Sequence, residues 1–198
     1  MPLPVVVLAS GEGTNLQALI DGPHSSGTIE LVGVASDRPD AAALDRARSA
    51  GLETACFPAS DFDDRKARDE ALGDWIESLE AELIVSAGYM QLLERSFVER
   101  FRDRVINVHP SLLPAFPGID AIGQALEAGV AETGVTVHFV DDGVDTGEII
   151  ASRRVAVPSK SSREDLEDLI HAAEHELLPD VVEGIATGKV ASGVRAAN

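Results

Sequence analysis

Short, uninterrupted apolar runs alternate along this chain with longer stretches whose apolar residues recur every three or four positions. A continuous apolar run is typical of a strand covered on both faces, and the longer period is typical of a helix. The expected strands are residues 4–10, 29–36, 53–57, 83–87, 105–109, 136–140 and 149–157. The expected helices are residues 16–21, 41–50, 63–80, 96–101, 122–129 and 161–178, the last of which ends at Pro179.

This alternation predicts an α/β fold with an open, mostly parallel, doubly wound sheet that carries helices on both faces. The last two expected strands flank the loop DDGVDTG, residues 141–147, so we expect them to form an antiparallel pair. Ser161 and Glu164 have the spacing of a capping box at the start of the last helix. Since no linker or repeat divides residues 1–198, we interpret them as a single domain.

Composition narrows the functions that such a domain can have. Asp and Glu number 34 against 16 Lys and Arg, which gives a formal net charge of −18. A surface this acidic repels phosphate backbones and anionic lipids, so we expect neither nucleic-acid nor membrane binding. The single cysteine, Cys56, excludes an intrachain disulfide and a four-thiolate zinc site. The first residues lack a basic segment and a cleavage site, and no apolar run could span a bilayer, so a cytoplasmic protein is expected.

Ligands of open α/β sheets bind beyond the carboxyl ends of the strands, where the turn GEGTN, residues 11–15, follows the first strand. Glycines permit a close approach of the backbone to a ligand, and free N–H groups at the start of a helix favour an anion. Leu16 stands where a dinucleotide fingerprint needs a third glycine, and the sequence has no Gly-Lys-Ser/Thr of a P-loop. A single bound phosphate and a plain tight turn both remain open at this point.

Polar side chains mark a strand end and a loop farther along the chain. Asn107 and His109 are two residues apart on a strand, so both side chains point to the same face. An amide beside an imidazole suits the stabilisation of an oxyanion in acyl transfer, although a strand-end histidine is often only hydrogen-bonded. Asp145-Thr146-Gly147 matches the aspartic-protease triplet, but that chemistry needs two such carboxylates and the chain has one triplet. We interpret this loop as solvated unless it faces a histidine.

The last expected helix carries the motif H-x-x-E-H, from His171 to His175, which is the inverted zinc-peptidase pattern. Its apolar stripe is formed by Leu166, Ile170, Ala173 and Leu177. Glu174 lies beside this stripe, and burying a carboxylate without a partner is unfavourable. Either a ligand group or a structural cation should therefore meet Glu174.

Together these segments resemble the phosphoribosylglycinamide formyltransferase family, whose members are folate-dependent enzymes of purine synthesis. The resemblance covers nearly the whole chain and rests on VVVLASGEGTNLQALID, FDDR, SAGYMQLL, INVHPSLLPAFPG, GVTVHFVDDGVDTGEII and AEHELLP. The most specific of these is INVHPSLLP. The resemblance implies transfer of a formyl group from 10-formyltetrahydrofolate to the amine of N1-(5-phosphoribosyl)glycinamide, without a metal ion.

The resemblance also implies roles for single residues. The catalytic trio would be Asn107, His109 and Asp145, with the carboxylate stabilising a protonated imidazole. The ribonucleotide would bind at Gly13, Thr14, Asn15, His171 and Glu174. The folate site would be formed by Arg65, Met90, Gln91, Leu92, Leu93, Asn107, Asp141, Asp142, Gly143, Val144 and Asp145. The bond between Leu113 and Pro114 would be cis.

Some positions depart from the pattern of many family members. Asp120 and Gly123 stand where a histidine and an arginine are common, and Gln91 stands where an arginine often follows the methionine. Because the folate is anionic and the chain is acidic, these changes bear on folate affinity rather than on the reaction class. Two rival functions are a zinc-dependent hydrolase built on His171 and His175, and a non-catalytic nucleotide-binding module that uses only the glycine turn. Small molecules are the expected partners, and the chain is expected to act as a monomer or homodimer.

Overall fold

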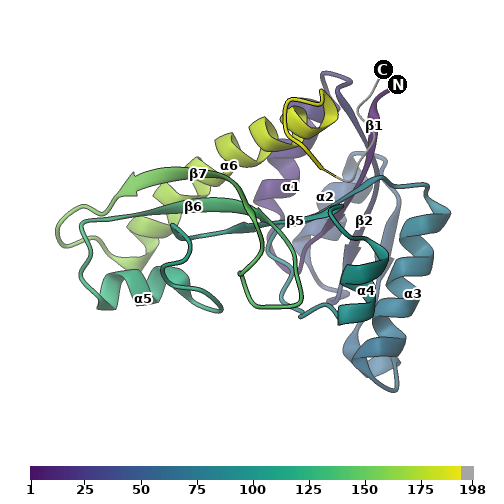
Figure 1. Cartoon of the computed structure of the whole chain (residues 1–198), viewed down its shortest axis with the longest axis horizontal. Helices are drawn as coiled ribbons and strands as arrows, with labels where there is room; N and C mark the ends of the chain where they lie inside the picture. Colours follow the sequence, from purple (N-terminus) through teal and green to yellow (C-terminus); the bar gives the residue numbers. More distant parts are fainter. Residues whose placement is uncertain (193–198) are drawn as a thin grey trace.

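The computed structural model describes residues 1–192, and it shows a central sheet with helices packed against both faces (Figure 1). Seven strands lie in the order β3-β2-β1-β4-β5-β6-β7. They are β1 (Leu3–Leu8), β2 (Ile29–Ser36), β3 (Thr54–Cys56), β4 (Leu83–Ser86), β5 (Val105–His109), β6 (Glu132–Phe139) and β7 (Ile149–Ala156). Every predicted strand is present, but β6 begins at Glu132 rather than at residue 136. Its first residues include the polar Glu132 and Thr133, which do not extend the apolar run on which the prediction rested.

The helices occupy the predicted stretches, and all but the last differ from them only by small shifts at their ends. They are α1 (Thr14–Leu19), α2 (Ala42–Ser49), α3 (Arg65–Ser78), α4 (Arg95–Arg100), α5 (Ala121–Glu127) and α6 (Arg163–Ala186), with a π-helical turn at Ile20–His24 and a 3-10 turn at Ala59–Asp61. In residues 1–192, none of the helices is long and apolar enough to cross a membrane.

The pairing of the strands confirms a mostly parallel sheet with an antiparallel end. β1 pairs parallel with β2 and β4, and the parallel pairing extends to β3 on one side and β5 on the other. β6 pairs antiparallel with β7, as the loop between them predicted, and it also pairs antiparallel with β5. The antiparallel part of the sheet therefore begins one strand earlier than the sequence indicated.

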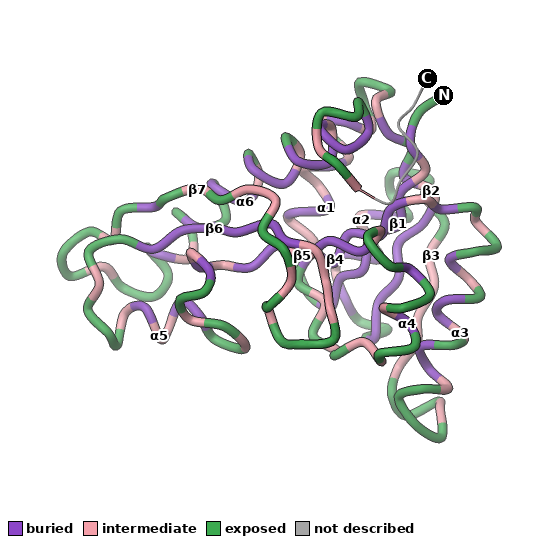
Figure 2. Tube along the Cα trace, viewed as in Figure 1, coloured by how far each residue is buried: buried purple, intermediate pink, exposed green. Residues whose placement is uncertain are grey.

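Successive residues of the central strands face opposite layers, which explains why their apolar runs are continuous. Val5 and Val7 belong to a core formed with residues of α1, α2 and α6. Val6 and Leu8 belong to a second core formed with residues of α3 and α4. Figure 2 shows the resulting pattern, with buried strands in the middle and helices that expose only their outer sides.

The register of the parallel strands places three chain segments at one edge of the sheet. Leu8 of β1 lies opposite Ser86 of β4, and Ser86 lies opposite Asn107 of β5. Because these strands run in the same direction, the glycine turn, the segment after β4 and the end of β5 all emerge beside one another. The fold thus brings together the segments that the sequence had marked as candidate sites.

Helix α6 differs from the prediction at both of its ends. Its N-cap is Ser162, whose hydroxyl accepts a hydrogen bond from the backbone N–H of Asp165, while the Asp165 carboxylate accepts one from the N–H of Ser162. The predicted capping box of Ser161 with Glu164 was therefore displaced by one residue.

The predicted end at Pro179 was also wrong, since the helix continues to Ala186. A proline inside a helix removes one hydrogen bond, and here the residues beyond it, Val181, Val182, Ile185 and Ala186, are buried in the core.

The observed cap generates a prediction about stability. Ser162→Ala should lower the free energy of unfolding by about 1 kcal/mol, because it removes the acceptor for a backbone N–H in the first turn. Ser161→Ala is the matched control and should change it by less than about 0.5 kcal/mol, as expected for a surface position outside the cap. Urea denaturation of the two variants measures both values. Equal destabilisation by the two substitutions would contradict the assignment of Ser162 as the N-cap.

Candidate active site

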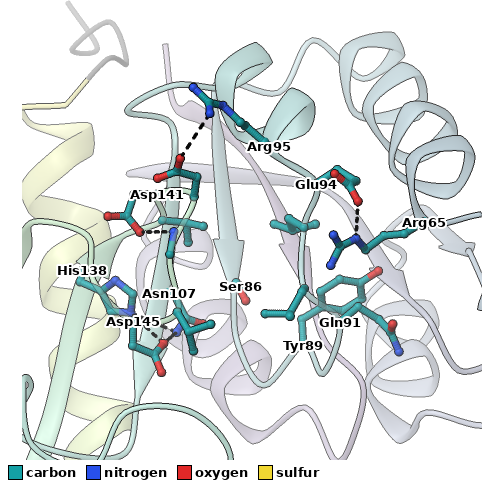
Figure 3. A pocket seen from close by; sticks show the side chains of 16 residues that line it. Arg65, Ser86, Tyr89, Gln91, Glu94, Arg95, Asn107, His138, Asp141 and Asp145 are labelled. Carbon is teal, nitrogen blue, oxygen red and sulfur yellow. Dashed lines mark hydrogen bonds and ion pairs between the residues drawn. The ribbon is translucent and has the colours of Figure 1, made fainter.

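A cavity of about 370 Å³ opens at the edge of the sheet where β4 and β5 end (Figure 3). Several residues predicted for the folate site line it: Arg65, Gln91, Leu92, Leu93, Asn107, Asp141, Asp142, Gly143, Val144 and Asp145. Residues that sequence reasoning missed also line it: Ser86, Tyr89, Glu94, Arg95, His138 and Val140. Met90, by contrast, is 69% exposed and is not part of this lining. The fold has therefore brought four separate segments of the chain around one cavity: Arg65, residues 86–95, Asn107 and residues 138–145.

The carboxylate of Asp145 joins the strand ends to the two loops around them. His109 Nδ1 lies 3.3 Å from Asp145 Oδ2, and the backbone N–H of Gly118 donates to the same oxygen at 2.7 Å. Asn107 Nδ2 donates to Oδ1 at 3.5 Å, and His138 Nε2 lies 3.5 Å from it. The predicted trio of Asn107, His109 and Asp145 is thus assembled in space, with His138 as an additional neighbour.

The imidazole of His109 is buried and held at both of its nitrogens. Nδ1 faces the Asp145 carboxylate, and Nε2 lies 2.8 Å from the carbonyl oxygen of Phe116. Both neighbours are acceptors, so an imidazole that carries a proton on each nitrogen satisfies both contacts. Phe116 itself has a positive φ of 53°, in the loop that follows β5 and contains the cis bond between Leu113 and Pro114, as the resemblance implied.

The surroundings of Asp145 favour its charged form. Burial raises the pKa of this carboxyl, but the hydrogen bonds from His138 and Gly118 and the neighbouring imidazoles lower it by more. The net pKa lies below the ordinary value of an aspartate. A negative charge therefore lies next to His109 at neutral pH. The loop that carries Asp145 was expected to be solvated unless it faced a histidine, and here it faces His109 and His138.

The contribution of His138 was missed, although the sequence carried a signal for it. β6 reads ETGVTVHF, and its apolar residues make the histidine conspicuous within the strand. His138 lies directly opposite Asn107 in the antiparallel register, and its Nε2 is 3.2 Å from Asn107 Nδ2. Only the pairing of β6 with β5 places this side chain at the site, and that pairing was not predicted.

The glycine turn starts α1 and lies against α2. Gly13 has a φ of 73°, and a Cβ at this position would come within 2.7 Å of the Cα of Ala43, so glycine is required for two reasons. Gly13 is the N-cap of α1 but lacks a side chain to bond the first-turn N–H groups. The turn therefore offers backbone donors in the arrangement that favours an anion.

Helix α6 meets this turn through a buried contact. Asn15 Nδ2 donates to Glu174 Oε2 at 2.8 Å, and Glu174 is 5% exposed. Asn15 Oδ1 and His175 Nε2 are two of the four buried side-chain atoms in residues 1–192 that lack a hydrogen-bond partner. The group that meets the inward glutamate is therefore the side-chain amide of Asn15.

The H-x-x-E-H motif does not assemble a metal site in the described chain. The rings of His171 and His175 stack with centroids 6.2 Å apart, on the flank of α6. Within residues 1–192, no group of three or more His, Cys, Asp or Glu side chains is arranged to hold a metal ion.

Comparison with known proteins identifies the family of this chain. A model of the formyl transferase family matches residues 3–182. The chain belongs to the formyl transferase family. It is 40% identical over 189 residues to the phosphoribosylglycinamide formyltransferase of Escherichia coli, a match that spans 94% of this chain and 88% of that protein. It is 41% identical over 187 residues to the trifunctional purine biosynthetic protein adenosine-3 of Drosophila melanogaster, covering 93% of this chain and 14% of that protein.

Solved structures of the family share the fold. Glycinamide ribonucleotide transformylase 1 from Symbiobacterium toebii superposes with a TM-score of 0.93 at 41% identity, over 100% of this chain and 95% of that one. As a formyl transferase, the chain has the fold that the sequence predicted, including the antiparallel pair near its end.

Glu174 makes the stability of this formyl transferase depend on pH. Burial raises the pKa of Glu174, and the hydrogen bond from Asn15 and the nearby His171 reverse this only in part, so the folded pKa lies above the ordinary value. The folded state holds this proton more tightly than the unfolded chain does. This contribution to stability is therefore complete below the unfolded pKa and is lost as pH rises through the folded pKa.

Glu174→Gln removes the charge and keeps an acceptor for Asn15. The variant should have a higher Tm than the wild type at pH ~8, and the difference should close near pH ~4, where a carboxyl is largely protonated. Thermal unfolding across this range measures it. The control is Asp168→Asn, an exposed position on the same helix that should show no such pH-dependent gap. A Tm difference that stays constant with pH would refute the assignment.

Proposed function

We propose that this chain transfers the formyl group of 10-formyltetrahydrofolate to the amine of N1-(5-phosphoribosyl)glycinamide, in de novo purine biosynthesis. The observation that carries the proposal is the assembly of Asn107, His109 and Asp145 beside the cavity, within a chain of the formyl transferase family. In the same proposal, residues 1–198 form a single domain that acts in the cytoplasm, as a monomer or a homodimer, on small molecules and without a metal ion.

The chemistry requires stabilisation of negative charge on the formyl oxygen. The amine nitrogen attacks the formyl carbon, and the charge of the tetrahedral intermediate develops on that oxygen. Asn107 is suited to donate an amide N–H to it, and protonated His109 to donate a charge-assisted bond from Nε2. In the present structure Nε2 faces the Phe116 carbonyl. When the formyl donor binds, the Nε2–H of His109 must therefore either leave the Phe116 carbonyl or be shared between that carbonyl and the formyl oxygen.

The intermediate collapses when the bond between the formyl carbon and N10 of the folate breaks. N10 takes up a proton as it leaves, and the attacking nitrogen loses one. Asp145 has a lowered pKa and stays ionised, so it is suited to hold His109 in its charged form and to receive the proton of the amine through a water molecule.

The two substrates have separate places in this proposal. The folate ring lies in the cavity between the segment 90–93 and the loop 141–145, where Leu92 and Val144 offer apolar surface and are 58% and 48% exposed. The phosphate of the ribonucleotide lies on the N–H groups of Gly13, Thr14 and Asn15. Glu174, with His171 on the same helix, meets polar groups of its sugar or glycinamide.

The central test is a formyl transfer assay with both substrates, applied to the wild type and to Asp145→Asn. Asp145 has a φ of 54°, and asparagine tolerates this left-handed conformation, so the variant changes the charge with little strain. kcat should fall by ~10²-fold or more, the usual range for an acid–base partner, while the KM for the ribonucleotide stays close to that of the wild type. Asp103→Asn is the control, because Asp103 is exposed and has a φ of 60°. An unchanged kcat in Asp145→Asn would reject the mechanism.

A second prediction concerns which substrate Glu174 recognises. Glu174→Ala should raise the KM for the ribonucleotide by about 10-fold, the effect of losing hydrogen bonds to a charged group. The KM for the formyl donor should change by much less, because the donor cavity is lined by other elements. Asp168→Ala, on the exposed side of the same helix, serves as the control. Equal increases for the two substrates, or the loss of a bound zinc ion on elemental analysis, would count against this role.

A further inference from the structure

An arginine on α3 is buried as deeply as the apolar core. Arg68 and its neighbour Asp69 are each 2% exposed. Arg68 donates from Nε and Nη2 to Asp69 Oδ1, at 2.9 and 2.7 Å. Side chains of adjacent residues on a helix normally point in different directions. A third group that bonds both side chains is therefore needed to hold this pair together. Removing two charges from water is unfavourable unless their remaining donors and acceptors are also bonded.

Both side chains are bonded to the segment 91–94, which lines the cavity. Arg68 Nη1 donates to Gln91 Oε1 at 2.7 Å, and Nη2 donates to the carbonyl oxygen of Leu92 at 3.0 Å. Asp69 Oδ2 accepts from the backbone N–H of Glu94 at 2.6 Å. The pair on α3 is therefore bonded to three residues of this segment.

The same segment is anchored from the opposite side by the ends of β1 and β2. Gln91 Nε2 donates to Asp37 Oδ2 at 2.7 Å, and the Ser10 hydroxyl donates to the other oxygen of Asp37. Ser10 Oγ in turn accepts from the backbone N–H of Met90 at 2.8 Å. In Figure 3 the Gln91 amide points away from Asn107 and Asp145.

Between Gly88 and the start of α4 the chain forms neither helix nor strand, so no ladder of backbone hydrogen bonds fixes its shape. Its backbone is held instead by the side chains of Ser10, Arg68 and Asp69. Leu92 and Leu93 line the cavity from this segment. A change at Arg68 would therefore alter the cavity wall, although Arg68 itself is not part of that wall.

We infer that Arg68 and Asp69 are positioning residues for the formyl-donor side of the cavity, and that Gln91 links them to the ends of β1 and β2. This inference rests on the proposed function, since it assigns the segment 90–94 to the donor. A structural explanation alone accounts poorly for the pair. Apolar residues of similar size at buried ion-pair positions often give equal or greater stability, whereas they could not bond the Leu92 carbonyl and the Glu94 N–H.

The experiment separates the two substrates in steady-state kinetics. The double variant Arg68→Met, Asp69→Asn removes the guanidinium without leaving a buried, unpaired carboxylate, and the introduced amide retains an oxygen for the Glu94 N–H. Its KM for 10-formyltetrahydrofolate should rise by about 10-fold, the loss expected for one charged hydrogen bond. The KM for the ribonucleotide should stay within about 2-fold of the wild type, because a shift in the 90–94 segment leaves the glycine turn in place.

Arg68→Lys keeps the charge pair and tests geometry alone. A lysine lacks the planar fork that serves Asp69, Gln91 and Leu92 together, so the donor KM should rise here too, with a smaller fall in Tm than in the double variant. In both variants, hydrogen exchange at the amides of Met90 and Glu94 should become faster. Arg100→Met is the control, since Arg100 pairs with Glu77 and Asp74 on the outside of α3, and it should leave both KM values unchanged.

The outcomes are distinct. A wild type without formyl transfer activity would overturn the proposed function and this inference with it. An active wild type, with variants whose two KM values change by the same factor, would overturn the inference alone. If the double variant fails to fold, Arg68→Lys decides, and an unchanged donor KM in that variant rejects the positioning role.

Discussion

The arrangement of the site depends on one partly buried carboxylate. Asp145 stands on the loop between β6 and β7, yet its oxygens meet side chains of β5 and β6 and a backbone N–H from the loop after β5. A carboxylate in this setting is stable only because donors surround it, and those same contacts hold His109 in place. Two loops that carry little regular structure are thereby fixed relative to the end of a strand.

A second buried polar network performs a similar task on the other side of the cavity. Arg68 and Asp69 bond the backbone of the segment after β4, while Ser10 and Asp37 hold it from the ends of β1 and β2. Apolar packing determines the positions of the helices and strands, but it is not directional. Hydrogen bonds to buried charged groups supply direction, and here they act at irregular segments that packing alone would leave undefined.

The glycine turn and α6 form the third part of this edge. Asn15 and Glu174 join a residue near the start of the chain to one near its end, over a gap in sequence that only the tertiary fold closes. Burial raises the pKa of Glu174, which makes its charged form less favourable here than in water. The three parts together explain why one end of the sheet is rich in polar side chains while its interior is apolar.

The sequence by itself determined the order and type of nearly all elements, because apolar periodicity reports directly which residues face a core. It also singled out Asn107, His109, Asp145 and the glycine turn, since polar residues at strand ends and in loops stand out from an apolar pattern. It misplaced the cap and the end of α6, where Ser161 and Ser162 offer similar caps and burial of later residues overrides Pro179. Tertiary structure alone decided the pairing that brings His138 opposite Asn107 and the burial of Arg68, because both depend on contacts between segments distant in sequence.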